Sequence, residues 1–115
     1  MRYLLMIYGN DEDWTQQSEE ELQPIMNEHE SFTSDLQKAG AFVASEALQP
    51  SATTTTIRLE QGKPLLTDGP YIESKEQVGG FYLIDVDNLD DALSWAKRLA
   101  SFEENPVVVW PAIDM

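Results

Sequence analysis

Hydrophobic and polar positions change their spacing several times along the chain, and this spacing predicts the secondary structure. Five short segments are apolar, β-branched or aromatic at many positions, which is typical of strands. They are residues 2–9, 41–48, 53–62, 79–86 and 106–113. Two longer segments carry an apolar stripe at helical spacing, from Leu22 to Leu36 and from Leu89 to Leu99, and predict helices.

The ends of both predicted helices carry local signals. Ser18 and Glu21 have the spacing of a capping box, so we expect the first helix to begin there. Pro24 removes one helical hydrogen bond, which predicts a first turn that is kinked or separate. Gly40 has the place of a C-cap, and Asn88 is the expected N-cap of the second helix.

These elements contain the order β-α-β-β-α-β, with one further strand among the three between the helices, an extra extended piece over residues 63–70 and a polar loop over residues 10–17. This order is typical of the split βαβ, ferredoxin-like pattern of the α+β class, in which two helices cover one face of an antiparallel sheet. The other face is then bare, and an apolar bare face usually marks an interaction site. We therefore expect a homodimer whose two sheets face each other around a shared cavity.

Composition narrows the class of protein. The chain has 115 residues, 42% of them hydrophobic, which fits a single domain spanning residues 1–115. It contains neither a membrane-length apolar run nor a signal-peptide pattern, so we expect a cytoplasmic protein. Cysteine is absent, which excludes disulfides, thiolate metal sites and a cysteine nucleophile. The net charge of −14 disfavours nucleic acid and anionic membranes as partners; it serves solubility, or it attracts a cationic ligand or a basic protein.

The segment "TDGPYIESKEQVGG", residues 67–80, is longer than a hairpin connection needs. Its Asp68-Gly69-Pro70 step combines a side chain that bonds its own backbone, a residue that tolerates positive φ and a residue with fixed φ. Such a step forms a tight turn. It either ends a strand and redirects the chain, or it fixes Asp68 at the mouth of a cavity as a base or polar anchor.

The rest of this segment also has two interpretations. Glu73, Lys75 and Glu76 either form an ion network in a solvated loop, or line a pocket in which the lysine neutralises an anion and the acids relay protons. Gly79 and Gly80 precede a predicted central strand, where adjacent glycines indicate a β-bulge or a close approach of another group to the backbone.

His29 is the single histidine, and it lies on the apolar stripe of the first helix, facing the sheet. It is either a satisfied core residue or a general base that acts with Asp68 or Ser45. Ser45 and Glu46 point to opposite faces of their strand, and no G-x-S-x-G elbow supports a serine nucleophile. One histidine without cysteine makes a metal site a poor interpretation.

The segments "DGPYIESKEQVGGFYLIDV" and "NLDDALSWAKRLA" together resemble the DGPF-domain branch of the YCII-related proteins, and the resemblance covers nearly the whole chain. Tyr71 stands where that motif has phenylalanine. The resemblance implies a dimeric α+β barrel built from ferredoxin-like units. Some relatives occur beside or fused to extracytoplasmic-type sigma factors, and others are small enzymes, including a dehydrochlorinase that acts on a chlorinated hydroxyquinol.

The wider group also implies a His–Asp pair as the active centre. His29 falls at the position of that histidine, whereas the aspartate expected after the second helix has no match in "WAKRLASF". Asp68 is the candidate to take its place.

Two functions follow as hypotheses. The first is a cofactor-free and metal-free dimer that binds a small molecule and carries out proton transfer or elimination. Its catalytic residues would be His29 and Asp68, and its ligand-binding residues would be Ser45, Tyr71, Glu73, Lys75 and Glu76. The second is a non-catalytic interaction or regulatory domain, in which the motif stabilises the dimer and the acidic surface binds a basic partner such as an extracytoplasmic-type sigma factor.

Overall fold

A computed structural model describes residues 1–114. Four strands form an antiparallel sheet in the order β2-β5-β1-β6. The chain runs through these elements in order: β1 (Arg2–Asn10), α1 (Asp11–Thr15), α2 (Glu19–Lys38), β2 (Phe42–Ala47), the 3₁₀ turn η1 (Ser51–Thr53), β3 (Thr55–Glu60), β4 (Lys63–Asp68), β5 (Glu76–Asp85), α3 (Leu89–Glu103) and β6 (Val107–Pro111).

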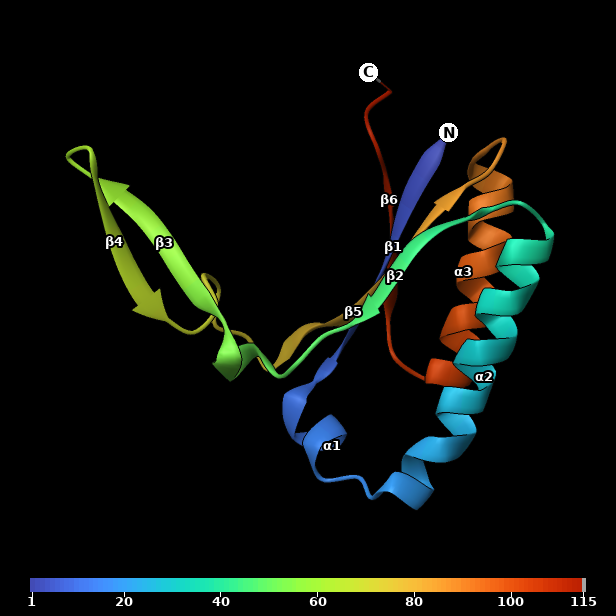
Figure 1. The fold of residues 1–115 in the computed structure, drawn as a ribbon, viewed down its shortest axis with the longest axis horizontal. Coiled ribbons are helices and arrows are strands. Elements are labelled where there is room, and N and C mark those ends of the chain that lie inside the picture. Colours follow the sequence, from blue (N-terminus) through green and yellow to red (C-terminus); the bar gives the residue numbers. More distant parts are fainter. Residues whose placement is uncertain (115) are drawn as a thin grey trace.

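The strand order interleaves two β-α-β units. Strand β1 pairs antiparallel with both β5 and β6, and β2 pairs antiparallel with β5. Strands β1 and β2 are therefore parallel to each other and separated by β5, which is the predicted split βαβ arrangement. Helices α2 and α3 lie on the same side of the sheet (Figure 1). The α+β class and the antiparallel sheet are confirmed.

Buried and less buried positions alternate along β1 and β5, so one face of the sheet is buried. This face packs against the two long helices, and the core lies between them. Phe32 of α2 is fully buried, and its ring makes edge contacts with Tyr82, Trp95 and Phe102 at centroid distances of 4.9, 5.7 and 5.8 Å. The fully buried large side chains are Leu5, Phe32, Leu36, Ile84 and Leu99.

The helix ends largely follow the sequence signals. The Ser18 hydroxyl accepts a hydrogen bond from the Glu21 N–H at 3.2 Å, and the Asn88 side chain caps α3. Gly40 has φ of +70°, directly after the C-cap of α2. However, α2 is continuous through Pro24, so its first turn is not separate from the rest of the helix; the alternative of a kinked first turn stays a prediction. Glu20, four residues earlier, is exposed, and water can bind the carbonyl oxygen that loses its partner.

Residues 10–17 are not entirely a loop, because Asn10 caps the short helix α1 by accepting a hydrogen bond from the Glu12 N–H at 2.9 Å. Helix α1 places the Trp14 indole across two glycines. A Cβ added at Gly9 or Gly79 would lie only 2.3 or 2.0 Å from that ring. The register between β1 and β5 also shifts at Gly79, so both the predicted bulge and the predicted close approach are confirmed.

Strands β3 and β4 form a separate two-stranded hairpin that projects from the rest of the molecule (Figure 1). The predicted extra extended piece is therefore the second strand of this hairpin. Every residue of β4 is exposed. The radius of gyration is 16.1 Å, compared with about 13 Å for a compact domain of this length. Across residues 1–114, no helix has the length and apolar character needed to cross a membrane.

Candidate functional site

A recess of about 1200 Å³ opens between the N-terminal half of α2, helix α1 and the helix-facing side of the sheet. Burial along α2 decreases toward its N-terminus: Phe32 and Leu36 are fully buried, whereas Met26 is 54% exposed. The first half of α2 therefore leaves the sheet uncovered. Trp14 provides an aromatic wall for this space, and Leu22, Ile25 and Met26 provide an aliphatic one.

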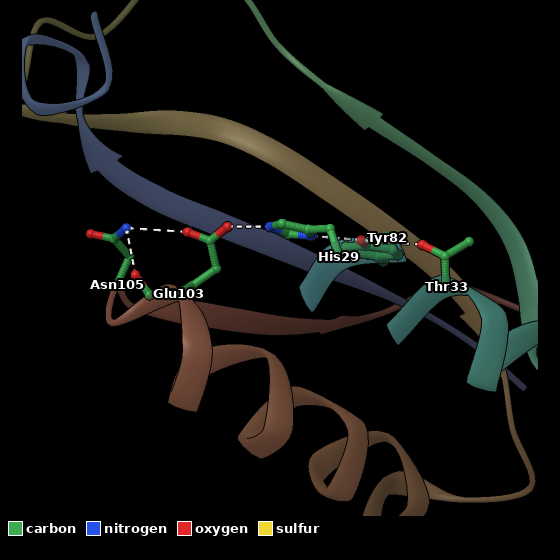
Figure 2. Close-up of polar contacts among 5 residues, drawn as sticks. All are labelled: His29, Thr33, Tyr82, Glu103 and Asn105. Atoms are coloured by element: carbon green, nitrogen blue, oxygen red, sulfur yellow. Dashed lines mark hydrogen bonds and ion pairs between the residues drawn. The ribbon is translucent and has the colours of Figure 1, made fainter. Parts of the chain in front are cut away.

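His29 lies in this recess and both of its ring nitrogens have partners. Nδ1 lies 2.7 Å from the Tyr82 hydroxyl, and Nε2 contacts a carboxylate oxygen of Glu103. The imidazole is nearly parallel to the Tyr82 ring and meets the Phe102 ring edge-on, with a centroid distance of 5.0 Å to Phe102. Figure 2 shows the resulting row of side chains, which joins α2, β5 and the end of α3. The packing and the two contacts fix the imidazole in one orientation.

Glu103 is the last residue of α3, and its side chain is only 10% exposed. A carboxylate at such a site needs partners to compensate for the loss of water. One oxygen contacts His29, and the other accepts a hydrogen bond from the Asn105 amide at 3.3 Å. The same amide donates to the Glu103 backbone carbonyl at 3.2 Å. Asn105 thus holds the carboxylate toward the imidazole.

Tyr82 completes the row at the opposite end from Glu103. Burial raises the pKa of its hydroxyl above the ordinary value of 10.0, and the nearby charge of Glu103 raises the pKa further, whereas the Thr33 hydrogen bond lowers it. The Thr33 hydroxyl lies 3.4 Å from the Tyr82 oxygen. Because the net effect is upward, Tyr82 is a neutral phenol at neutral pH and serves as a hydrogen-bond donor.

The hydrogen-bond directions depend on the charge of the imidazole. When His29 is neutral with its proton on Nε2, that N–H donates to Glu103 and Nδ1 accepts the Tyr82 O–H. When His29 is protonated, both N–H groups donate, and the Tyr82 hydrogen is released toward Thr33 or the recess. The row Glu103–His29–Tyr82 can therefore pass one proton between the recess and the imidazole.

The walls of the recess carry negative charge only. Among the described residues that line it, six are acidic and none is lysine or arginine. The acidic residues are Asp13, Glu21, Glu30, Glu46, Glu103 and Glu104. A cleft with charges of one sign concentrates ligands of the opposite sign, so this recess disfavours anions.

The residues predicted for the site divide between two places. His29 and Ser45 line the large recess, and Ser45 lies directly opposite Tyr82 in the pairing of β2 with β5. Asp68 and Glu73 line a separate hollow of about 370 Å³ beside η1. Within one copy of the chain, the structure does not bring His29 and Asp68 together.

The remaining predicted ligand-binding residues lie on the surface. Tyr71, Lys75 and Glu76 are exposed, and the Arg58 guanidinium lies 5.8 Å from the centre of the Tyr71 ring. Among residues 1–114, no ion pair joins Glu73, Lys75 or Glu76 to another side chain, so the loop is solvated, as the first interpretation expects, but the ion network is absent. The loop is instead fastened by Gln77, whose amide donates to the Ile72 and Ser74 carbonyl oxygens at 3.0 and 3.2 Å.

The Asp68-Gly69-Pro70 step forms the turn that its sequence predicts. Gly69 has φ of +100°, its N–H donates to the Thr54 carbonyl at 2.8 Å, and its own carbonyl accepts from the Thr56 hydroxyl at 2.8 Å. These bonds tie the end of β4 to the start of β3. The step is thus the point where the chain leaves the hairpin, as the first interpretation expects. Asp68 also borders the smaller hollow, so its role there stays a prediction.

Sequence reasoning missed Tyr82, Glu103 and Trp14 as site residues. Tyr82 carries a usable signal, because it alternates with Ile84 along β5 and so shares the face that the His29 stripe covers. Glu103 directly follows the segment "WAKRLASF", where the family resemblance implied an acid, and it supplies the carboxylate beside His29 from one residue further on.

Comparisons with known proteins find the same kind of relative along nearly the whole chain. The sequence model of the YCII-related domain family matches residues 1–112. An uncharacterized protein of Rhizobium meliloti (strain 1021) is 31% identical over an alignment of 117 positions. The alignment includes 96% of this chain and 94% of that relative.

Proposed function

This chain belongs to the YCII-related family, and we propose that its recess binds a small neutral or cationic molecule and exchanges a proton with it without a cofactor. The observation that carries this proposal is the row of contacts from Glu103 through His29 to Tyr82, which ends in the recess. An imidazole held between a carboxylate and a hydroxyl is the arrangement that general acid–base catalysis uses.

The proposed reaction moves two protons at the same time. A C–H or O–H proton of the substrate passes to the Tyr82 oxygen while the Tyr82 proton passes to Nδ1 of His29. The imidazolium that forms is stabilised by the negative charge of Glu103. Reversing the steps returns a proton to the product. In an elimination, the electron pair of the broken C–H bond becomes the new double bond, and the leaving group departs with its own bonding pair. The proton held by His29 then passes back through Tyr82 to the leaving group or to water.

The residues that line the recess indicate the charge, polarity and size of its ligand. The acidic residues exclude carboxylates and phosphates, and the aromatic face of Trp14 suits an apolar or cationic group. Thr33 and Ser45 offer hydroxyls near Tyr82 that can orient a polar substituent. The volume of about 1200 Å³ is above the range of about 300–1,000 Å³ of ordinary small-molecule sites, so the recess holds a ligand together with water.

Proton exchange itself provides the test. Wild type is incubated in D₂O with neutral and cationic molecules that carry an acidic C–H bond, and the loss of each C–H signal is followed by proton NMR. We expect at least one molecule to exchange faster with wild type, and Tyr82→Phe and His29→Asn to slow that exchange about 100-fold or more. Glu28→Gln, an exposed change beside His29 and outside the recess, serves as the control.

Two results would oppose the proposal. The first is that no molecule in the set exchanges a proton with wild type and none raises its melting temperature. The recess would then have no support as a binding site, and the alternative of a non-catalytic interaction domain would be favoured. If exchange occurs but both variants retain it, the chemistry lies elsewhere.

The predicted homodimer remains part of the proposal. The side of the sheet opposite the helices carries apolar side chains that alternate with the core residues. They are Leu4, Met6, Phe81, Leu83, Val108 and Trp110, which the strand register places beside one another. Trp110 is 58% exposed in one copy. A second copy placed on this face would bury these side chains and give the dimeric barrel that the family resemblance implies. Light scattering measures the assembly directly, and a 13.0 kDa species at high concentration would exclude it.

A further inference from the structure

The hairpin of β3 and β4, residues 55–68, which we call the arm, presents an apolar face without cover. In the strand register, Ile57 lies opposite Leu66 and Leu59 lies opposite Pro64, so these four side chains share one face, with the polar pair Thr55–Asp68 at its base. Ile57, Leu59 and Leu66 are 63%, 74% and 62% exposed. The other face is mixed, because it carries the pairs Thr56–Thr67, Arg58–Leu65 and Glu60–Lys63.

Such an arm is unusual as a free structure. An isolated two-stranded hairpin is at best marginally stable in water, because it buries too little apolar surface to offset the entropy of ordering its backbone. The arm forms its own sheet, separate from the four-stranded one. Its turn is well specified, since Gln61 and Gly62 both have positive φ, at 51° and 79°. A defined hairpin with an exposed apolar face indicates a surface that another molecule covers.

The position of the arm indicates which molecule this is. Figure 1 shows the arm and the helices on opposite sides of the four-stranded sheet. The arm therefore extends from the side where Val108 and Trp110 are exposed. A molecule placed on that face of the sheet lies beside the arm. If this molecule is a second copy related by a two-fold axis, each arm reaches the other copy, and both apolar surfaces are buried in one assembly.

Charge also favours a second copy. Within the arm, Arg58 and Lys63 balance Glu60 and Asp68, so the net charge of −14 lies entirely on the rest of the chain. A neutral arm meets an acidic body without the repulsion that two acidic surfaces experience. A basic protein would be attracted to the acidic body rather than to this neutral hairpin.

We propose that the arm is an exchanged clasp: in a homodimer, the apolar face of each arm packs against the other copy of the chain. This inference rests on the proposed dimer and adds to it the surface that holds the two copies together. It predicts that the arm becomes ordered and protected only on association, whereas the four-stranded sheet and its helices are folded in either state.

Charged substitutions on the two faces of the arm provide a matched test. Ile57→Asp with Leu66→Asp places charge on the apolar face, and Leu65→Asp with Thr67→Asp places the same charge on the mixed face, at the positions that flank Leu66. Sedimentation equilibrium on the full chain gives the dimer dissociation constant of each form. We expect the first pair to raise this constant more than tenfold and the second pair to change it less than threefold.

Two further readouts separate the arm from the dimer as a whole. Hydrogen exchange should show protection of the arm amides that grows with protein concentration. In a mixture of labelled and unlabelled chains, isotope-filtered NOEs should link the Ile57 and Leu66 methyl groups to the other copy. A stable wild-type dimer with unprotected arms, or with equal effects of both variant pairs, would refute the clasp but leave the dimer. A monomeric wild type would refute both, without bearing on proton exchange in the recess.

Discussion

Removing the Tyr82 hydroxyl is the sharpest single test of the Glu103–His29–Tyr82 row. Tyr82→Phe keeps the ring that packs against Phe32 and deletes only the oxygen that contacts His29 at 2.7 Å. Nδ1 of His29 then loses its partner. Because the His29 side chain is 27% exposed, water can partly replace that partner, and we expect a loss of about 1 kcal/mol in the free energy of unfolding at pH 7.

The pH dependence carries more information than this single value. The pKa of Tyr82 is raised in the folded state above 10.0, so between pH 10.0 and the folded-state pKa the unfolded chain releases a proton that the folded chain keeps. The contribution of Tyr82 to stability is therefore complete below pH 10.0 and is lost as the pH rises through the folded-state pKa. In that window, the advantage of wild type over Tyr82→Phe should shrink by about 1.4 kcal/mol per pH unit.

Two measurements check this reasoning. Urea unfolding of both proteins between pH 7 and 11 gives the difference in stability, and ultraviolet absorbance near 295 nm follows the ionisation of the four tyrosines. We expect Tyr82 of wild type to ionise above pH 10.0, because its pKa is raised in the folded state, and this step to be absent from Tyr82→Phe. Identical titration curves apart from the lost chromophore, or a stability difference that does not change above pH 10, would refute the buried hydrogen-bonded phenol.

Three other substitutions test neighbouring features, each by urea unfolding at pH 7. Gly79→Ala places a Cβ 2.0 Å from the Trp14 ring and should destabilise by about 1–3 kcal/mol; an unchanged midpoint would show that the indole does not lie there. Asn88→Ala removes the cap of α3 and should lower stability by about 1 kcal/mol; no loss would contradict the cap. Glu103→Gln removes the negative charge beside His29 and should lower stability by about 1–3 kcal/mol, whereas the exposed neighbour Glu104→Gln should change it by less than about 0.5 kcal/mol.

The parts of the fold that could be predicted depend on short-range physics. Ser18 and Asn88 bond N–H groups three residues away, so the helix starts can be read from the sequence itself. Gly79 indicated a bulge because glycine weakens a strand, and it is favoured there mainly where the backbone bends or another group approaches it closely. By contrast, Pro24 does not separate the first turn of α2, since the effect of a helical proline depends on whether the carbonyl that loses its partner is exposed to water.

The candidate site depends on long-range contacts and could be predicted only in part. The helical stripe correctly placed His29 against the sheet, but its partners come from 53 and 74 residues further along the chain. No local spacing brings Glu103 to the imidazole; the length of α3 and its crossing over the sheet do so. Asp68 lies in a more specific sequence motif than His29 does. Its segment nevertheless forms the base of the arm, where the Gly69 N–H donates to the Thr54 carbonyl.

The polar motif and the recess are nevertheless connected through the backbone. The turn at Gly69 ends the arm, and the loop held by Gln77 then leads directly into β5. Strand β5 places Gly79 beneath Trp14 and, three residues later, Tyr82 beside His29. A change in the turn would therefore shift the start of β5 before it altered any polar contact in the recess. On this basis we propose that the motif positions the wall that holds Tyr82, while the proposed proton chemistry belongs to the residues of that wall and of the two helices that cover it.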